Sequence, residues 1–288
     1  MTSNVALDVE PPAPSADLLS IEQIRRRLVT DRVGFQIYLF GEVSSTNDVL
    51  RHLATAAAAD GTVVLAESQT MGRGRLGKPW FSPPGVNLYA SILLRPAIEP
   101  VVVPAYAFIA SLAVTEAIWV EGGPASIKWP NDVLVEDRKV GGTLVTYATA
   151  GDRVGYVILG VGVNLNVDRA TLRSGLGPTA PDATSVREAV GHPVDRNAFT
   201  AALLNFVEKW DDEYRWHGAV PILAALRERD ALRGRTVRVV GSGDACCGTA
   251  RGVTDRGRLI VEGLDGVHHE VTSGEVTATV APPRRPCR

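Results

Sequence analysis

Residues 128–163 read KWPNDVLVEDRKVGGTLVTYATAGDRVGYVILGVGV, and the apolar, β-branched runs in this stretch predict neighbouring strands. The predicted strands are residues 133–135, 140–147 and 156–163. The spacers between them are centred on EDR and AGD, which are short enough for hairpins. Strands that a hairpin joins are antiparallel, so part of the sheet is predicted to be antiparallel.

Similar runs come before this stretch and alternate with segments of helical periodicity. They predict strands at residues 35–40, 62–66 and 88–94, and helices at residues 47–59, 105–120 and 196–216. We therefore expect an α/β domain over residues 17–232, with a mixed sheet covered by helices. A single helical segment precedes the first strand, and a helix-turn-helix needs at least two helices, so no DNA-reading domain is expected.

The character of the sequence changes after residue 232. Five short strand candidates follow, at residues 236–240, 247–253, 258–262, 268–271 and 276–280, and glycine-containing turns separate them. Five short strands in about fifty residues predict a small β-barrel over residues 233–280. Residues 1–16 are rich in proline and alanine without periodicity and are expected to be a disordered leader, and residues 281–288 a frayed tail.

Composition excludes several classes of protein. The 288 residues are 45% hydrophobic and 22% charged, and 30 basic against 32 acidic residues give a net charge of −2. Such a chain has no general positive field for nucleic acid or an anionic membrane. Three cysteines build no paired framework or metal-ligand spacing, the N-terminus does not read as a secretory signal, and the uncharged run at residues 100–115 predicts a buried core helix. A cytoplasmic protein is expected.

Residues 69–80, QTMGRGRLGKPW, hold three glycines, three cations and no acid between two predicted strands. Glycine allows close backbone approach, and arginine and lysine supply charge-assisted donors, so the segment is a candidate loop for a phosphate or carboxylate. A flexible basic loop or an RNA contact is the alternative. The glycine spacing matches neither a P-loop nor a Rossmann fingerprint.

Three further segments are candidates for a site. After the Trp-Pro of KWPND, Asn131 and Asp132 can hold a hard cation, a ribose or a phosphate, or else open an Asx turn. Lys139 lies near that turn if the strands pair as a hairpin. VGVNLN at residues 161–166 fits a backbone that approaches a planar ligand, or a β-bulge. STN at residues 45–47 fits a helix N-cap whose hydroxyls also contact a polar ring.

Seven motifs taken in order carry a family resemblance. They are STN at residues 45–47, ESQTMGRGRLGKPW at 67–80, FSP at 81–83, NLYAS at 87–91, KWPND at 128–132, DRK at 137–139 with Gly141, and GVGVN at 160–164. Together they closely resemble the bacterial biotin protein ligases, of the monofunctional type without an N-terminal DNA-binding domain. The resemblance covers roughly residues 34–280, and SGEV at 273–276 resembles part of that family's SH3-like C-terminal barrel.

The resemblance implies a biotin–[acetyl-CoA-carboxylase] ligase that uses ATP and Mg²⁺. The biotin carboxylate attacks the α-phosphate of ATP, and a lysine of the biotin carboxyl carrier protein then attacks the biotinyl-adenylate. It implies neither a DNA nor a membrane partner, and it leaves a monomer and a homodimer open. Two rivals remain: a lipoate or octanoate ligase of the same architecture, and a biotin- or nucleotide-sensing regulator without turnover.

The resemblance also implies roles for individual residues. The catalytic set is Lys139, which donates to the biotin carboxyl and the α-phosphate, with Arg75 at the anionic junction and Asp132. The implied biotin-binding set is Ser45, Thr46, Asn47, Gln69, Gly72, Arg73, Lys139 and Gly141. The implied ATP- and adenylate-binding set is Arg73, Arg75, Trp80, Lys128, Asn131, Asp132 and Asn164, with Trp80 and Asn164 near the adenine. Asn131 and Asp132 are implied to serve Mg²⁺-ATP or to receive the incoming lysine.

The strand after Lys139 departs from the family pattern. It reads VGGTLVT, where the family usually has alanine in place of Gly142, isoleucine in place of Thr143 and an acid in place of Thr146. The Thr143 hydroxyl is therefore expected beside an apolar wall of the ligand pocket.

Overall fold

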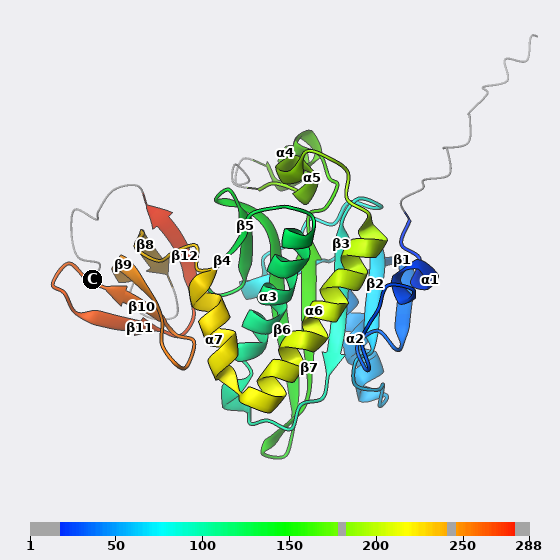
Figure 1. The fold of residues 1–288 in the computed structure, drawn as a ribbon, viewed down its shortest axis with the longest axis horizontal. Helices are drawn as coiled ribbons and strands as arrows, with labels where there is room; N and C mark the ends of the chain where they lie inside the picture. Colours follow the sequence, from blue (N-terminus) through cyan, green and yellow to red (C-terminus); the bar gives the residue numbers. More distant parts are fainter. Residues whose placement is uncertain (1–17, 178–182, 241–245, 280–288) are drawn as a thin grey trace, which may run out of the picture.

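The structure, a computed structural model, describes residues 18–177, 183–240 and 246–279. Over these residues the chain forms one large and one small β-sheet, with helices packed on the large one (Figure 1). The leader predicted at residues 1–16 and the tail predicted at residues 281–288 lie outside the described residues.

The large sheet has seven strands in the order β1-β2-β3-β7-β6-β5-β4. The pair β1 and β2 is parallel, and every other neighbouring pair is antiparallel. The mixed sheet and the two hairpins predicted from residues 128–163 are thus confirmed. The strands are β1 (Ile37–Val43), β2 (Val63–Gln69), β3 (Leu88–Leu94), β4 (Ala125–Lys128), β5 (Asp132–Val135), β6 (Arg138–Ala150) and β7 (Arg153–Val163).

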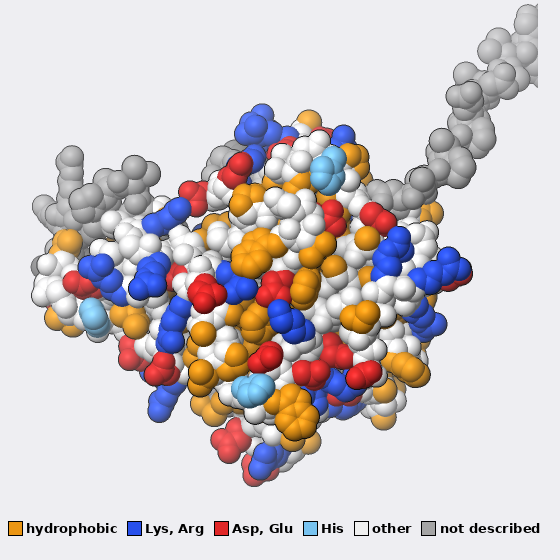
Figure 2. All heavy atoms as spheres, viewed as in Figure 1, with side chains coloured by type: hydrophobic (Ala, Val, Ile, Leu, Met, Phe, Trp, Pro, Cys, Tyr) orange, Lys and Arg blue, Asp and Glu red, His pale blue; other side chains and the backbone are white. Residues whose placement is uncertain are grey.

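Three helices cover one face of this sheet: α3 (Ala105–Val120), α6 (Arg196–His217) and α7 (Ala219–Glu228). Among the described residues one helical stretch, Pro100–Val120, is long and apolar enough to cross a membrane, but 72% of its most apolar window is buried inside the protein. It is the core helix that the sequence predicted. On the outer surface of these helices acidic and basic side chains are intermixed (Figure 2).

The helix α2 (Thr46–Thr55) packs on the opposite face, against β2, β3 and β7. Its contact with the sheet is a small second core of buried side chains: Leu50, Ala54, Val64, Leu93 and Ile158. Five short helices complete the described fold. They are α1 (Ile21–Arg25), α4 (Arg169–Leu176), α5 (Val186–Val190) and the 3-10 helices η1 (Arg75–Gly77) and η2 (Pro100–Val102). Because α2 covers only part of its face, the ends of β5, β6 and β7 stay open on that side.

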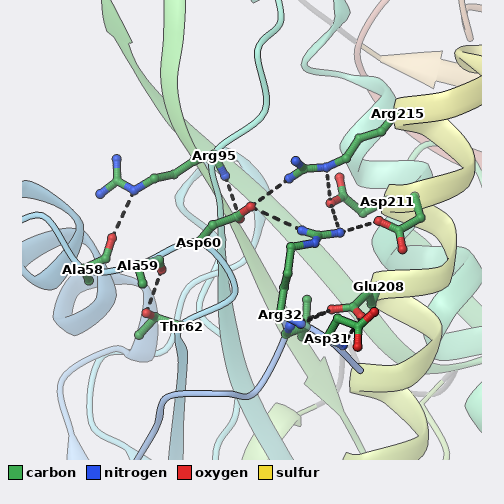
Figure 3. A network of polar contacts seen from close by, with 12 residues as sticks. Asp31, Arg32, Ala58, Ala59, Asp60, Thr62, Arg95, Glu208, Asp211 and Arg215 are labelled. Atoms are coloured by element: carbon green, nitrogen blue, oxygen red, sulfur yellow. Dashed lines mark hydrogen bonds and ion pairs between the residues drawn. The ribbon is translucent and has the colours of Figure 1, made fainter. Parts of the chain in front are cut away.

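A network of arginines and aspartates fixes the far end of α2 (Figure 3). Asp60 accepts hydrogen bonds from Arg32 Nη1 at 3.2 Å, from Arg215 Nη2 of α6 at 3.0 Å and from the backbone N of Arg95 at 3.0 Å. The Arg95 guanidinium donates to the carbonyl of Ala54 at 2.8 Å, where α2 ends. A cation at a helix C-terminus satisfies carbonyls that have no partner inside the helix. The network therefore sets where α2 lies, and with it the position of its N-terminus.

The small sheet contains β8 (Thr236–Val240), β9 (Cys246–Val253), β10 (Leu259–Glu262), β11 (His268–Val271) and β12 (Glu275–Thr279). All its pairs are antiparallel, in the order β11-β10-β9-β8-β12, as the prediction of an SH3-like barrel requires. We call these residues the C-terminal sheet. Cys246 is a free thiol on β9, whereas Cys247 is disulfide-bonded, so the expectation that no cysteine is paired is wrong for this residue.

The C-terminal sheet packs on the large domain through specific contacts. The indole Nε1 of Trp129 donates to the carbonyl of Gly257 at 2.9 Å, in a buried position. Gly257 has φ +72°, and a Cβ there would lie 2.5 Å from the Phe108 ring, so glycine is needed for both conformation and space. This contact holds the turn between β9 and β10 against Trp129 and α3.

Candidate active site

A cavity of about 990 Å³ opens where the uncovered strand ends meet the loop 70–80 and the C-terminal sheet. Its floor is set by strand register, because one row of paired residues crosses five strands at the same level. Small residues in the middle of this row leave room for a ligand or a side chain. The row is Lys128, Asp132, Gly142, Gly162 and Tyr89.

Trp80 lies flat over the two glycines of this row. A Cβ on Gly162 would lie 2.5 Å from the Trp80 ring, and a Cβ on Gly142 would lie 3.5 Å from it. The Nζ of Lys139 is 5.4 Å from the centre of the ring, in cation–π range. The indole Nε1 of Trp80 is buried and has no hydrogen-bond partner in the described part of the chain. A buried donor without a partner beside a cavity is suited to a ligand acceptor.

Charged groups converge at the end of the floor. Lys139 Nζ lies 2.5 Å from the Asp132 carboxylate. Arg75 Nη1 donates to Asn131 Oδ1 at 3.2 Å, while the Asn131 amide donates to the Thr143 carbonyl at 2.5 Å. Burial lowers the pKa of Arg75 below its ordinary value, and the Asp132 and Glu275 carboxylates oppose that shift. The three predicted catalytic residues therefore lie together, around space for an anion.

The donor set near Asp132 bears on the predicted Mg²⁺. In the part of the chain that is described, no three His, Cys, Asp or Glu side chains gather as metal ligands. Asp132 offers one carboxylate and Asn131 one amide oxygen, and both already have cationic partners. Magnesium needs few protein ligands when phosphates and waters supply the rest. The pair fits an ion that arrives on ATP, and it does not fit a resident metal.

A polar pocket lies at the N-terminus of α2. The Gln69 side chain accepts from the Thr46 backbone N at 3.0 Å and donates from Nε2 to Ser82 Oγ at 3.2 Å, so its amide orientation is fixed. Ser45 stands at the predicted N-cap position, yet its side chain makes no capping hydrogen bond and is almost wholly buried. Its hydroxyl is therefore available to another partner, such as a polar group on a ligand ring.

The loop above the cavity is tethered to α2. Arg73 forms an ion pair with Asp48 in the first turn of α2, and Arg51 pairs with the same carboxylate at 2.7 Å. Gly72 is needed for close approach, since a Cβ there would lie 2.7 Å from the Trp80 carbonyl. Arg73, predicted to face an anionic ligand, thus has a protein carboxylate as its partner here.

Every predicted site residue but one lines the cavity; the exception is Gly141. A Cβ on Gly141 would point toward Val114 of α3, and Gly142 faces the cavity in its place. Thr143 also lines the cavity, but its hydroxyl is buried and lies 3.3 Å from Ser111 Oγ on α3. The hydroxyl that was expected beside an apolar wall of the pocket thus lies next to another hydroxyl. Side chains alternate between the faces of a strand, so an offset of one residue reverses the assignment.

Two parts of the cavity wall were missed in the sequence. One is contributed by the C-terminal sheet, through Gly274, Glu275 and Val276, and the other by α4, through Leu172, Gly175 and Leu176. Neither segment carries a local signal, because both reach the site only through the fold. Asn164 lines the cavity as predicted, but its side chain already bonds within the chain, donating to the Thr184 carbonyl at 3.0 Å.

Comparison with known proteins agrees with this geometry. Residues 39–164 match the model described as "Biotin/lipoate A/B protein ligase family", and residues 233–277 match "Biotin protein ligase C terminal domain". A biotin protein ligase from Aquifex aeolicus, solved in complex with biotin and ATP, superposes with a TM-score of 0.71 at 27% identity, covering 85% of this chain and 99% of that one.

Among curated proteins, the biotin–[acetyl-CoA-carboxylase] ligase of Mycobacterium tuberculosis is 34% identical over 271 residues, which cover 90% of this chain and 95% of that protein. The ligase of the same name from Paracoccus denitrificans is also 34% identical, covering 79% of this chain and 95% of that protein. The bifunctional ligase/repressor BirA of Bacillus subtilis is 34% identical, covering 86% of this chain and 76% of that protein. Likeness of this extent shows that the chain belongs to the biotin protein ligase family.

Proposed function

We propose that this protein joins biotin to a lysine of a carrier protein in two steps driven by ATP. In the first step a biotin carboxylate oxygen attacks the α-phosphorus, and the bond to pyrophosphate breaks. In the second, the carrier lysine attacks the acyl carbon of biotinyl-AMP, and AMP leaves. The name shared by two similar ligases, biotin–[acetyl-CoA-carboxylase] ligase, supports the biotin carboxyl carrier protein of acetyl-CoA carboxylase as the acceptor.

One observation carries the proposal for the chemistry: Lys139, Arg75 and Asp132 converge beside Trp80 at the end of the polar pocket. Both reactants of the first step are anions, so their approach needs fixed positive charge between them. Preorganised cations in a site that excludes water are the main way in which enzymes stabilise such a transition state. Lys139 is placed to donate to the biotin carboxyl and the α-phosphate, and Arg75 to hold their junction.

The other residues bind and orient the reactants. Ser45, Thr46 and Gln69 surround the polar ring of biotin, and Trp80 packs near the adenine. Magnesium, bound with ATP at Asn131 and Asp132, would shield phosphate charge. Once Lys139 turns to the substrates, the Asp132 carboxylate is released to receive the ammonium of the carrier lysine.

The two rivals receive less support. The family description covers both biotin and lipoate ligases, but the relatives at 34% identity are biotin ligases. The altered strand after Lys139 gave slight support to a regulator without turnover, but the hydroxyl of Thr143 in this strand lies beside Ser111 of α3. A cytoplasmic location fits the use of ATP. Sedimentation with and without biotinyl-AMP distinguishes a monomer from a homodimer.

Single-turnover labelling of an acceptor domain tests the proposal. Lys139→Ala is expected to slow formation of biotinyl-AMP by about 10²–10³-fold, as does loss of one transition-state donor. Lys209→Ala is the matched control, because Lys209 lies on α6 and pairs with Glu116 outside the cavity. Formation of biotinyl-AMP by Lys139→Ala at the wild-type rate would show that the central role of Lys139 is wrong.

A further inference from the structure

Ser91 is a fully buried hydroxyl in the middle of β3, on the face that α2 covers. It does not line the cavity, yet its Oγ lies 2.8 Å from Thr46 Oγ1 and 2.5 Å from Asn47 Oδ1. Its neighbour across the sheet is Gly160, and Asn47 lies directly on that glycine, where a Cβ would come within 2.5 Å of Oδ1. Ser91 therefore touches both residues that begin α2 at the polar pocket.

The number of hydroxyl hydrogens in this cluster determines which oxygens donate hydrogen bonds and which accept them. Thr46 and Ser91 carry one hydroxyl hydrogen each. Thr46 Oγ1 accepts from Ser91 Oγ at 2.8 Å and donates to Gln69 Oε1 at 3.2 Å. The single Ser91 hydrogen goes either to Asn47 or to Thr46, and in either case Thr46 donates to Gln69. In both arrangements the Thr46 hydrogen stays inside the protein, and its oxygen keeps a lone pair for the cavity.

We infer that Ser91 is a positioning residue of the pocket: it holds Thr46 Oγ1 as a hydrogen-bond acceptor and so selects a ligand ring that carries an N–H donor. The inference rests on the proposed function, in which Thr46 meets the biotin ring. The cyclic urea of biotin has two N–H donors and one carbonyl acceptor, and the uncapped Ser45 hydroxyl is available to that carbonyl.

This polarity separates the two substrates of the wider family. The dithiolane ring of lipoate has two sulfur atoms and no N–H, so it would leave the Thr46 oxygen buried without a donor. A site built to hydrogen-bond a substrate group rejects the analogue that lacks the group, because its own buried polar atoms are then unpaired. Ser91 thus favours biotin over a lipoyl group without touching either.

Calorimetric binding of biotin tests the inference. Ser91→Ala is expected to raise the biotin Kd by about tenfold, the effect of one lost buried hydrogen bond, and to change the ATP Kd by less than about twofold. The control is Ser111→Ala, which removes another fully buried serine hydroxyl, one that donates to the Ala107 carbonyl within α3. It is expected to leave both Kd values unchanged. An unchanged biotin Kd in Ser91→Ala overturns the inference.

A double-mutant cycle with Thr46→Val distinguishes positioning from general destabilisation. If Ser91 acts through Thr46, adding Ser91→Ala to Thr46→Val changes the biotin Kd by less than about twofold. A further tenfold loss in that background would overturn the inference. Should Ser91→Ala fail to fold by circular dichroism, Ser91→Cys takes its place in the cycle, since its S–H is a much weaker donor than the hydroxyl. Wild-type protein that does not bind biotin overturns the proposed function itself, whereas biotin binding with additive losses overturns only the role of Ser91.

Discussion

Two glycines on β7 let side chains lie directly on the sheet at the site. Asn47 lies on Gly160 and Trp80 lies on Gly162, each in a space that a Cβ would occupy. Glycine in a strand interior costs stability through lost packing and greater backbone freedom, and it is typical of places where another group must come close. The site therefore depends on the absence of a side chain at Gly160 and Gly162.

Gly162→Ala tests this dependence. The added Cβ would come within about 2.5–2.8 Å of several Trp80 ring atoms, so the indole must move off the floor of the cavity. Overpacking of this kind costs about 1–3 kcal/mol, and we expect the ATP KM in a pyrophosphate-release assay to rise by about tenfold. Gly41→Ala on β1 is the control, because a Cβ at Gly41 meets no atom within 4 Å. An unchanged ATP KM would show that the position of Trp80 does not affect ATP binding.

At the scale of elements, α2 connects the polar pocket to the arginine network at its far end. Arg95 donates to the carbonyl of Ala54 in the last turn of this helix and to the carbonyl of Ala58 just beyond its end. Arg95→Met is expected to lower the free energy of unfolding by about 1–3 kcal/mol, since these carbonyls lose a charged donor. Urea unfolding measures the change. Arg51 lies on the exposed face of α2, and Arg51→Met is expected to change the free energy of unfolding by less than about 0.5 kcal/mol. An equal loss in both variants would show that Arg95 does not anchor the end of α2.

The elements that the sequence predicted are those that depend on local pattern. The hairpins of β5, β6 and β7 follow from apolar runs and short spacers, and α6 was predicted at residues 196–216 and spans Arg196–His217. The parallel pairing of β1 with β2 and the strand order depend on contacts between distant residues, which periodicity does not describe. The end of α2 was also misplaced: the helix ends at Thr55, and Ala57 beyond it has φ 62°.

The sequence likewise predicted some parts of the site correctly and missed others. Motif residues that follow a strand, such as Asp132 and Lys139, lie together because hairpin register brings them together. Gly141 was chosen over Gly142 because the face of a strand residue cannot be read without the register, and β5 pairs with β6 through an irregular step. Ser91 belongs to the NLYAS motif, but its contact with Thr46 arises only when α2 packs on β3.

Considered as a whole, the molecule has a net charge of −2, and most cations of its basic loop are paired with carboxylates. Two of the three cations in residues 69–80 have carboxylate partners: Arg73 pairs with Asp48 of α2, and Lys78 with Glu275 of the C-terminal sheet at 2.6 Å. Arg75 lies between them and also donates to the Gly274 carbonyl at 3.5 Å. The loop is thus attached to an element on each side of the cavity, and the C-terminal sheet forms one wall of the site.

The Lys78–Glu275 pair makes the attachment of the loop to that wall dependent on pH. The hydrogen bond from Lys78 holds the pKa of Glu275 below its ordinary value of 4.5. A carboxyl whose pKa is depressed by folding stabilises the folded state fully above its ordinary pKa, and this contribution is lost as the pH falls through the folded value. Both side chains are more than half exposed, so the contribution is small, about 0.5 kcal/mol, and it weakens in high salt.

Glu275→Gln should therefore act mainly on the loop. At pH 7.5 we expect trypsin to cleave after Arg75 several-fold faster in this variant than in wild type, because the loop loses its ion pair with the C-terminal sheet. Glu262→Gln is the matched control: Glu262 also has a lowered pKa, but its partner is Arg251 within the C-terminal sheet and not a loop residue. The difference in unfolding free energy between wild type and Glu275→Gln should be present at pH 7 and vanish at pH 3. Equal cleavage rates for both variants would mean that Glu275 does not attach the loop, and Arg75 with Gly274 would then be the contact that closes this wall of the cavity.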